Sequence, residues 1–382
     1  MKPRAITGSG LVSALGVGRE EHHAALREGA ATGSGRPITS FDATACPDAQ
    51  VAEVPEFDPT RYLGDKGLRT LDRQTKLLVV AARLCLHDCG IKKDRAFVAL
   101  GPDRVGLCAS NAYGSVEAIT ELDRVALLED ARYINPAKFP NTVANSASGY
   151  VSIWEDLRAL NVTVTDGNCG ALDAVTCADV HLETGRADAV LVGGVEAMSE
   201  GLYLAFQRLG PITSRTVLGE GAALFSMEPL EAARARGARV EATVLGTGTS
   251  FGAPPHDGAL LFGSQEAAER AVQGALRDAG VAASDVDLVV SGVIGQGPFT
   301  DAELGAIARV VGEGVAVAAP KTLFGETLGA GGAMGMAAAI AWMDGVPVRT
   351  LVRGEAPSKV RTTLVTTLGY YGNATAMVMQ RA

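Results

Sequence analysis

Apolar and polar positions follow two periods along this chain, and together they predict an α/β fold. Residues 162–165 (Val-Thr-Val-Thr) read as a strand that ends at Gly167. From there to Gly185 the apolar residues recur at helical spacing, and 189–192 form a second, fully apolar strand that ends at Gly193 and Gly194. The pattern predicts a strand, a sharp turn, a helix and another strand. The turn places residue 168 at a helix N-terminus, where free N–H groups and partial positive charge favour a nucleophile.

The same alternation continues on both sides of this stretch. Helices are expected over 19–28, 71–89, 142–157, 264–279, 301–311 and 328–343, and further strands over 105–109, 244–249, 286–292, 315–319 and 363–367. Residues 36–60 are polar and irregular, so we expect a surface loop there. A second half begins near Arg239, which predicts an N-terminal part over 1–238 and a C-terminal part over 239–382. Both parts share the order of elements, although no residue-level repeat is visible.

Composition narrows the class of protein. With 382 residues, 47% hydrophobic residues and a mean hydropathy of +0.17, the chain reads as a globular protein. A net charge of −9 gives no reason to propose nucleic-acid binding. The N-terminus lacks a long apolar run, so we expect neither a signal peptide nor a membrane span. The six cysteines show no framework spacing, which favours a reducing, cytoplasmic location.

The stretch around residue 168 resembles the nucleophile region of the β-ketoacyl-ACP synthases, the condensing enzymes of the thiolase fold. The resemblance is carried by Gly185 and Asp188 at the helix end and by Gly193-Gly194-Val195-Glu196 after the second strand. The family's spacing from Gly185 places the nucleophilic cysteine at Asn168. Residues 168–174 (NCGALDA) resemble the Q-A-G-G-L-D-A string of chain length factors, the inactive ketosynthase-like partners of type II polyketide synthases, which carry glutamine in place of the cysteine.

This resemblance extends over nearly the whole chain and implies a thiolase-like, five-layered αβαβα fold with two pseudo-duplicated halves. It also places two histidines that polarise the malonyl thioester in active members. The first would fall on Val293 or Ile294, and the second on Glu326, within a frame that retains Lys321. A carboxylate opposes an enolate through like charge. We therefore expect no catalytic residue and no metal site.

Cys169 is the rival nucleophile, because it lies one residue past the turn and still close to the helix N-terminus. A shifted register would make the chain an acyltransferase or a malonyl decarboxylase that uses Cys169. The other reading of Cys169 is a small buried residue. The five histidines, of which His22 and His23 are expected on an exposed first helix, read as solvated or packing residues that do not serve Cys169.

The resemblance also implies partners. An active ketosynthase would form a heterodimer with this chain, and the substrate would be an acyl chain held on the phosphopantetheine of an acyl carrier protein, with no cofactor of the chain's own. No membrane partner is expected. Residues expected along the tunnel or the interface are Tyr113, Val116, Ile119, Leu122, Phe139 and Asn145. The helical face among them could equally be ordinary core.

Two departures from the aromatic chain length factors leave the product class open. Asparagine replaces glutamine at 168, and the loop over 211–218 is shorter than in active members. Together they favour a linear, polyene-type product. The remaining alternative is a structural scaffold subunit with no role in the tunnel.

Overall fold

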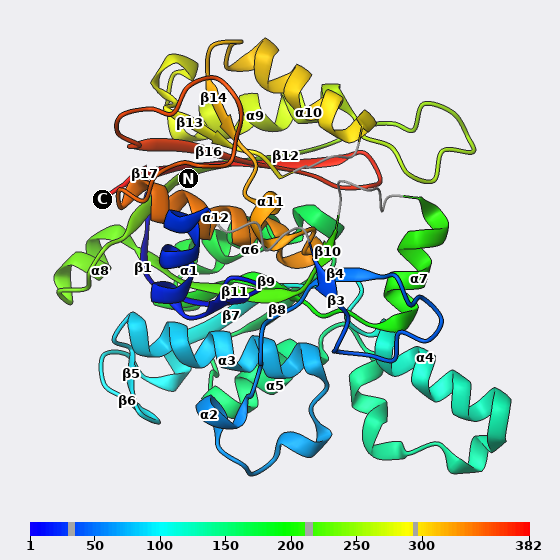
Figure 1. Ribbon diagram of the computed structural model, residues 1–382. Helices are drawn as coiled ribbons and strands as arrows, with labels where there is room; N and C mark the ends of the chain where they lie inside the picture. The colour runs from blue at the N-terminus through cyan, green and yellow to red at the C-terminus, as the bar shows by residue number, and fades with distance from the viewer. Residues whose placement is uncertain (30–34, 211–216, 293–296) are drawn as a thin grey trace.

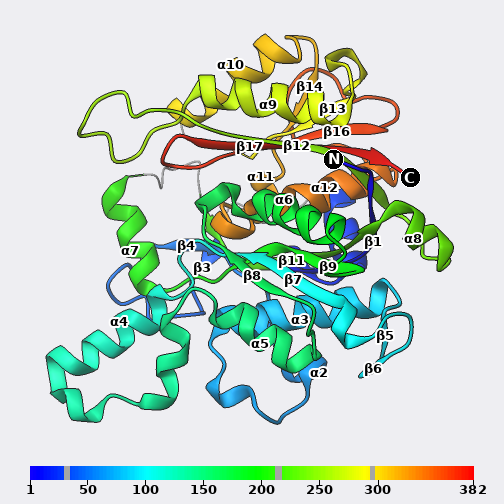
Figure 2. The ribbon, with the colours of Figure 1, turned by 180° about the vertical axis from the view of Figure 1, so that it is seen from behind.

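The protein is built as five alternating layers of helices and sheets. The computed structural model describes residues 1–29, 35–210, 217–292 and 297–382. Figures 1 and 2 show helices on both outer faces, two layers of strands beneath them, and a pair of helices between the strand layers. The thiolase-like, five-layered fold expected from the sequence is confirmed.

The first strand layer comes from the N-terminal half. Its order is β8-β7-β9-β11-β1, in which β7 runs parallel to β8 and β9, whereas β11 is antiparallel to both β9 and β1. The bounds are β1 (Arg4–Ser13), β7 (Val105–Ser110), β8 (Asn161–Val164), β9 (Ala189–Glu196) and β11 (Gly221–Pro229). Each of these strands except β8 is buried along almost its whole length.

The second strand layer repeats this pattern. Its order is β14-β13-β16-β17-β12, with β13 parallel to β14 and β16, and with β17 antiparallel to β16 and β12. The bounds are β12 (Ala242–Phe251), β13 (Leu288–Val290), β14 (Ala316–Ala318), β16 (Thr362–Leu368) and β17 (Asn373–Arg381). The two halves therefore repeat the same strand order and the same strand directions, although no repeat is visible in their residues. The layers meet where 4–6 of β1 pair with 242–244 of β12.

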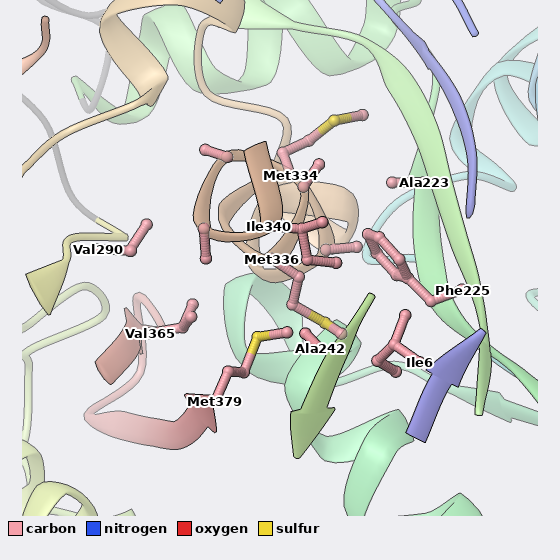
Figure 3. Close-up of a cluster of buried hydrophobic side chains, with 14 of the residues drawn as sticks. Ile6, Ala223, Phe225, Ala242, Val290, Met334, Met336, Ile340, Val365 and Met379 are labelled. Carbon is pink, nitrogen blue, oxygen red and sulfur yellow. The ribbon is translucent and has the colours of Figure 1, made fainter. Parts of the chain in front are cut away.

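Helices cover the two strand layers and fill the space between them. The central pair is α6 (Gly170–Glu183) and α12 (Gly331–Met343). The outer helices are α3 (Arg73–Asp88) and α5 (Ser146–Glu155) on one side and α9 (Gln265–Ala279) and α10 (Gly297–Val310) on the other. α12 is buried on every face, as expected of a helix that is apolar all round. Figure 3 shows its Met334, Met336 and Ile340 between Phe225 on one strand layer and Val365 on the other.

Shorter helices and strands connect or flank these layers. They are β2 (Gly16–Val17), α1 (Arg19–Glu28), β3 (Arg36–Pro37), β4 (Gln50–Ala52), α2 (Thr60–Leu63), β5 (Lys92–Lys93), β6 (Ala96–Phe97), α4 (Val116–Val125), α7 (Glu200–Leu209), β10 (Leu218–Gly219), α8 (Leu230–Ala235), α11 (Lys321–Phe324) and β15 (Leu351–Arg353). The boundary expected at 238/239 lies between α8 and β12. Among the described residues, no helix is both long and apolar enough to span a bilayer.

Two local expectations were wrong. The supposed surface loop over 36–60 contains β3 and β4, which form a small sheet with β10 and bury Val51 and Val54. Strands of two and three residues are too short to show an alternation of apolar and polar residues in the sequence. His22 was expected on an exposed face, but it is 2% exposed and its Nε2 lies 3.1 Å from the Ser13 hydroxyl and 3.2 Å from the Gly16 carbonyl oxygen. Burial lowers the pKa of His22 to about 4.

Candidate functional site

The N-terminal ends of the two central helices meet at one buried point. A 3-10 turn over Gly167–Cys169 precedes α6, and an equivalent turn over Leu328–Ala330 precedes α12. Glycine permits this close approach, because a Cβ on Gly332 of α12 would lie only 2.9 Å from Cγ of Leu172 on α6. Free N–H groups of both helices therefore point towards the same small region, which favours negative charge.

A buried ion pair occupies this region. Glu326 is 1% exposed, and its Oε1 and Oε2 lie 2.8 Å and 2.7 Å from Nζ of Lys321, which is 2% exposed. The backbone N–H of Leu328 donates to Glu326 Oε1 at 2.9 Å. The carboxylate thus receives the charge of a lysine and the N-terminus of α12. The resemblance places a histidine at position 326, and a neutral imidazole there would need no counter-charge. The buried carboxylate of Glu326 does need one, and Lys321 supplies it.

Asn168 lies on the opposite side of this carboxylate. Its side chain is 3% exposed, and its amide nitrogen is 3.5 Å from Glu326 Oε2, a long hydrogen bond. The amide oxygen has no hydrogen-bond partner among the described residues. An amide can donate to the carboxylate, but it supplies no nucleophile. Asn168, Lys321 and Glu326, three positions singled out by the motifs, therefore lie together around one buried carboxylate.

Cys169, the next residue along the chain, makes its contact with β16. It is fully buried, and its Sγ lies 3.6 Å from the carbonyl oxygen of Thr367. Burial, and then the nearby Asp173 carboxylate, raises the pKa of the Cys169 thiol to about 12. A thiol in this environment stays protonated near neutral pH, so the position at the helix N-terminus does not make it reactive.

The region of the first family histidine is described only in part. Val293 and Ile294 lie outside the described residues. The nearby Glu303 is 1% exposed and accepts hydrogen bonds from the hydroxyls of Ser291 and Thr366 (2.6 Å for Thr366) and from the Gly292 N–H at 3.1 Å. Burial raises the pKa of Glu303. This carboxyl group ties α10 to β16 and to the residues that follow β13.

A second buried carboxyl group holds the frame of the site together. Glu196, at the end of β9, accepts the backbone N–H groups of Ala112 (2.8 Å), Tyr113 (3.0 Å) and Gly329 (3.1 Å). It therefore joins the turn after β7 to the turn before α12. Burial raises the pKa of Glu196 to about 7. The sequence showed Glu196 only as part of a motif, because its three partners are backbone groups from distant segments.

A row of aromatic rings adjoins the ion pair, and sequence reasoning missed it. The Tyr370 hydroxyl lies 3.4 Å from Glu326 Oε2, and its ring makes edge contacts with Phe206 and Phe299 at centroid distances of 5.8 Å and 5.3 Å. Phe206 in turn contacts Tyr113 at 5.6 Å, and the Tyr113 and Tyr371 hydroxyls are 2.5 Å apart. Four separate segments supply these rings, so no local spacing could have revealed the row.

The residues expected along a tunnel or an interface lie mostly outside this site. Tyr113 is half-buried in the aromatic row, whereas α4 carries half-buried Val116 and Leu122 and the 40%-exposed Ile119. Phe139 is 65% exposed, and Asn145 is exposed at the start of α5. Figures 1 and 2 show α4 and the turns that follow it projecting from the layered body.

Large apolar side chains are concentrated on this projection. We call them the arm patch, and its members, 50% to 82% exposed, are Leu127, Leu128, Tyr133, Phe139 and Val143. Single exposed apolar residues are ordinary, but five within seventeen positions of one segment are typical of a surface that another protein covers.

The chain is similar to known proteins in both sequence and structure. Two family models match: "Beta-ketoacyl synthase, N-terminal domain" over residues 1–233 and "Beta-ketoacyl synthase, C-terminal domain" over residues 241–350. The 3-oxoacyl-(acyl-carrier-protein) synthase 2 of Rhizobium meliloti (strain 1021) is 30% identical over 389 residues, covering 92% of this chain and 89% of that protein.

Solved structures give the same picture. The ishigamide ketosynthase/chain length factor superposes with a TM-score of 0.89 and 25% identity, covering 100% of this chain and 99% of that chain. A beta-ketoacyl synthase from Burkholderia phymatum STM815 has a TM-score of 0.87 and 25% identity, covering 100% of both chains.

Proposed function

Because the chain belongs to the beta-ketoacyl synthase family, we propose that it is a non-catalytic ketosynthase-like subunit of the chain-length-factor type. It pairs with an active ketosynthase and shapes the tunnel that holds the growing acyl chain during decarboxylative Claisen condensation. The substrate is a polyketide intermediate on the phosphopantetheine of an acyl carrier protein. The chain itself uses no metal and no cofactor.

One observation carries this proposal: buried Asn168 lies against the ion pair of Glu326 and Lys321. Condensation needs a thiolate to carry the acyl chain and donors that stabilise an enolate. An amide cannot carry an acyl group, and a fixed carboxylate destabilises an adjacent enolate. The surrounding scaffold is intact, because Glu196, Glu303 and Lys321 all keep buried hydrogen bonds or ion pairs. The side chains needed for condensation are therefore replaced, whereas the residues that hold the fold around them are kept.

The proposed partner surface is the edge strand β8 together with the arm patch. β8 has a neighbouring strand on one side only among the described residues, and its four residues are exposed or half-buried. An unpaired edge of this kind is a template for a strand of another chain. The likeness to a ketosynthase/chain length factor structure, across the full chain, supports a ketosynthase as that partner.

The finer parts of the proposal rest on the sequence. A linear, polyene-type product is favoured by asparagine at 168 and by the short loop over 211–218. A cytoplasmic location is favoured by six cysteines without framework spacing, all of which are free.

Two alternatives are weaker. An acyltransferase or malonyl decarboxylase would have to use Cys169, which is fully buried, has a raised pKa and has its Sγ 3.6 Å from the backbone carbonyl oxygen of Thr367. A scaffold subunit with no tunnel role would share the fold and the partner, and it differs only in leaving product length unchanged.

The experiment is an intact-mass measurement. The purified chain is incubated with acyl-loaded and malonyl-loaded carrier protein, next to a Cys169→Ser control and an active ketosynthase as a positive control. We expect no acyl adduct and no loss of carbon dioxide from malonyl groups. A stable adduct that is present in the wild type and absent from Cys169→Ser overturns the proposal.

A further inference from the structure

A groove opens on the outer face of the N-terminal half, where the segment after α2, the end of α5 and the turn between β5 and β6 come together. Its first hollow has a volume of about 570 Å³, and the lining residues that matter here are Asp65, Lys66, Arg83, Arg95, Ile153 and Trp154. A second hollow of about 440 Å³ continues from it and shares Arg83 and Arg95. We call the two hollows the outer groove. Figure 1 shows that a strand layer lies between this face and the central helices, so the outer groove is separate from the site around Asn168.

A positively charged cluster of buried side chains forms the base of the outer groove. Arg83 of α3 is 9% exposed; it donates from Nε to Glu155 Oε1 at 2.7 Å and from a terminal nitrogen to the Tyr62 carbonyl oxygen at 3.1 Å. Lys92 of β5 is 4% exposed and donates to the same carboxylate at 3.1 Å. Two buried cations thus share one carboxylate, and an excess of positive charge remains beneath the groove.

Two exposed cations also line the first hollow. Lys66 follows α2, and Arg95 lies in the turn between β5 and β6. Among the described residues, neither has an ion-pair partner, whereas Arg83 pairs with Glu155. The first hollow has one carboxylate in its described lining, that of Asp65. The chain as a whole carries a net charge of −9, so this local excess of positive charge is unusual for it and attracts an anion.

An aromatic ring and an apolar side chain complete the first hollow. Trp154, near the end of α5, is half-buried, and its neighbour Ile153 is 74% exposed. A Cβ on Gly67 would lie 3.1 Å from Cζ2 of Trp154, so the indole ring adjoins the segment that carries Lys66. A ring next to cations suits a ligand that combines a flat apolar part with negative charge.

The type of cation and the size of the hollow narrow the ligand further. Arg83 and Arg95 line both hollows, and planar guanidinium groups bind phosphate oxygens through paired N–H donors. The second hollow also contains the carboxylate of Asp94, so the first hollow is the better site for an anion. Its volume of about 570 Å³ lies within the roughly 300–1,000 Å³ of small-molecule sites. These features favour a small organic phosphate over a folded partner.

We propose that the outer groove is a nucleotide-binding site. The phosphate groups lie between Lys66 and Arg95 above the buried Arg83, and the base packs on Trp154. The site is independent of the proposed function, because neither Asn168 nor Glu326 takes part in it. Binding joins three segments that are far apart in the sequence, and it should therefore stabilise the folded chain.

Tryptophan fluorescence reports on this site directly. The chain has two tryptophans: Trp154 lines the first hollow, whereas Trp342 is 2% exposed in the core. The folded, full-length chain is titrated with ADP, GDP and UDP, and separately with pyrophosphate and with adenosine. We expect at least one nucleotide to quench the fluorescence and to bind about tenfold or more tightly than pyrophosphate or adenosine. Raising the salt concentration from about 50 mM to about 500 mM should weaken this binding about tenfold.

Variants at exposed or half-buried positions assign the two parts of the ligand. Lys66→Ala combined with Arg95→Ala should weaken nucleotide binding about tenfold or more, as measured by titration calorimetry, because the phosphates lose both unpaired cations. Trp154→Leu should abolish the preference for a nucleotide over pyrophosphate and leave the affinity for pyrophosphate unchanged. Arg234→Ala, on the exposed face of α8, is the matched control and should change neither affinity.

Three results would overturn the proposal. The first is the absence of quenching by all three nucleotides up to about 5 mM. The second is unchanged nucleotide affinity in the Lys66→Ala and Arg95→Ala double variant, which would place the ligand elsewhere. The third is binding of an oligoglutamate peptide without binding of any nucleotide, which would make the outer groove a surface for acidic peptides.

Discussion

The two halves of the molecule repeat one topology but differ at two equivalent places. At the helix starts, α6 follows a turn that carries neutral Asn168, whereas α12 follows a turn beside the charged pair of Glu326 and Lys321. At the sheet edges, β14 is paired with β15, whereas β8 has no outer neighbour among the described residues. The shared frame therefore tolerates very different chemistry at its ends.

These two differences should affect different properties, the helix starts the stability of the fold and the sheet edges the binding of a partner. The C-terminal half covers β14 with the three-residue strand β15, and it neutralises its own buried charge. The N-terminal half places a weakly bonded amide at its helix start and leaves a strand edge open. We therefore expect changes at the start of α12 to affect the free energy of unfolding, and changes at β8 to affect binding.

The largest expected effect is on the ion pair. Glu326→Ala leaves the Lys321 ammonium buried without a partner, which should lower the free energy of unfolding by about 3–5 kcal/mol. Asn168→Ala is the matched change at the other helix start, and it should cost about 1 kcal/mol or less because its single hydrogen bond is long. Urea unfolding curves measure both values.

A double variant keeps this prediction testable if Glu326→Ala is insoluble. Lys321→Met with Glu326→Leu removes both charges and should recover most of the lost stability. Equal losses for Glu326→Ala and Asn168→Ala would contradict the contrast between the helix starts.

The next effect concerns the open edge. The Leu107 N–H donates to the Leu160 carbonyl and the Asn111 N–H to the Val164 carbonyl. The backbone N–H and C=O groups of even-numbered residues along β8 therefore point towards β7. The N–H of Thr163 therefore faces outwards. Thr163→Pro removes it without breaking the pairing with β7, and should weaken binding to the partner ketosynthase by about 100-fold or more.

The matched control is Val352→Pro on β15, the short edge strand of the other half. It should leave binding unchanged when the dissociation constant is measured by titration of the two purified subunits. Wild-type affinity in Thr163→Pro, with an unchanged circular dichroism spectrum, would show that β8 is not the interface.

A third effect comes from His22 on α1. The equivalent segment of the C-terminal half, between β12 and α9, contains no helix. The unfolded chain protonates His22 near pH 6.5, whereas the folded chain does so only near pH 4. Because the unfolded state binds the proton first, stability is lost as the pH falls from about 6.5 to about 4. The loss should total roughly 3 kcal/mol over that window.

His22→Gln should flatten this dependence, and His256→Gln, at an exposed position, should not. The measurement is the urea midpoint at half-unit intervals of pH. Parallel curves for wild type and His22→Gln would place the acid sensitivity elsewhere.

The smallest expected effect is on product length. If α4 borders the acyl chain, Val116→Trp or Ile119→Trp should reduce occupancy by the longest intermediates about tenfold, since overfilling a cavity costs about 1–3 kcal/mol. Leu122→Ala should lengthen or broaden the products. Mass spectra of released products, at equal complex concentration, decide between a tunnel wall and a scaffold, for which only total yield would change.

Much of the fold could be predicted from sequence because it depends on local pattern. The strand over 189–192 and the helix ending at Gly185 follow from apolar periods and a glycine stop. α12 begins at Gly331 rather than 328, because a 3-10 turn precedes it. Residues 142–145 precede α5, since a 3-10 helix over Pro136–Thr142 occupies the start of the expected helix.

The site was predictable only in part, for a physical reason. Asn168, Lys321 and Glu326 lie in motifs of fixed spacing, so a resemblance could place them. The aromatic row and the three N–H groups bound by Glu196 arise from segments far apart in the chain, and tertiary packing alone brings them together. The burial that raises the pKa of the Cys169 thiol likewise has no local signal.

The central claim is that this chain assists condensation without performing it. The most direct measurement is product formation by the complex of this chain and an active ketosynthase, supplied with malonyl-loaded carrier protein. We predict that changing the partner's nucleophilic cysteine to alanine abolishes product, whereas Asn168→Ala or Cys169→Ser in this chain leaves the rate within about twofold. Loss of product on Cys169→Ser in an intact complex, or product from this chain alone, would contradict the account.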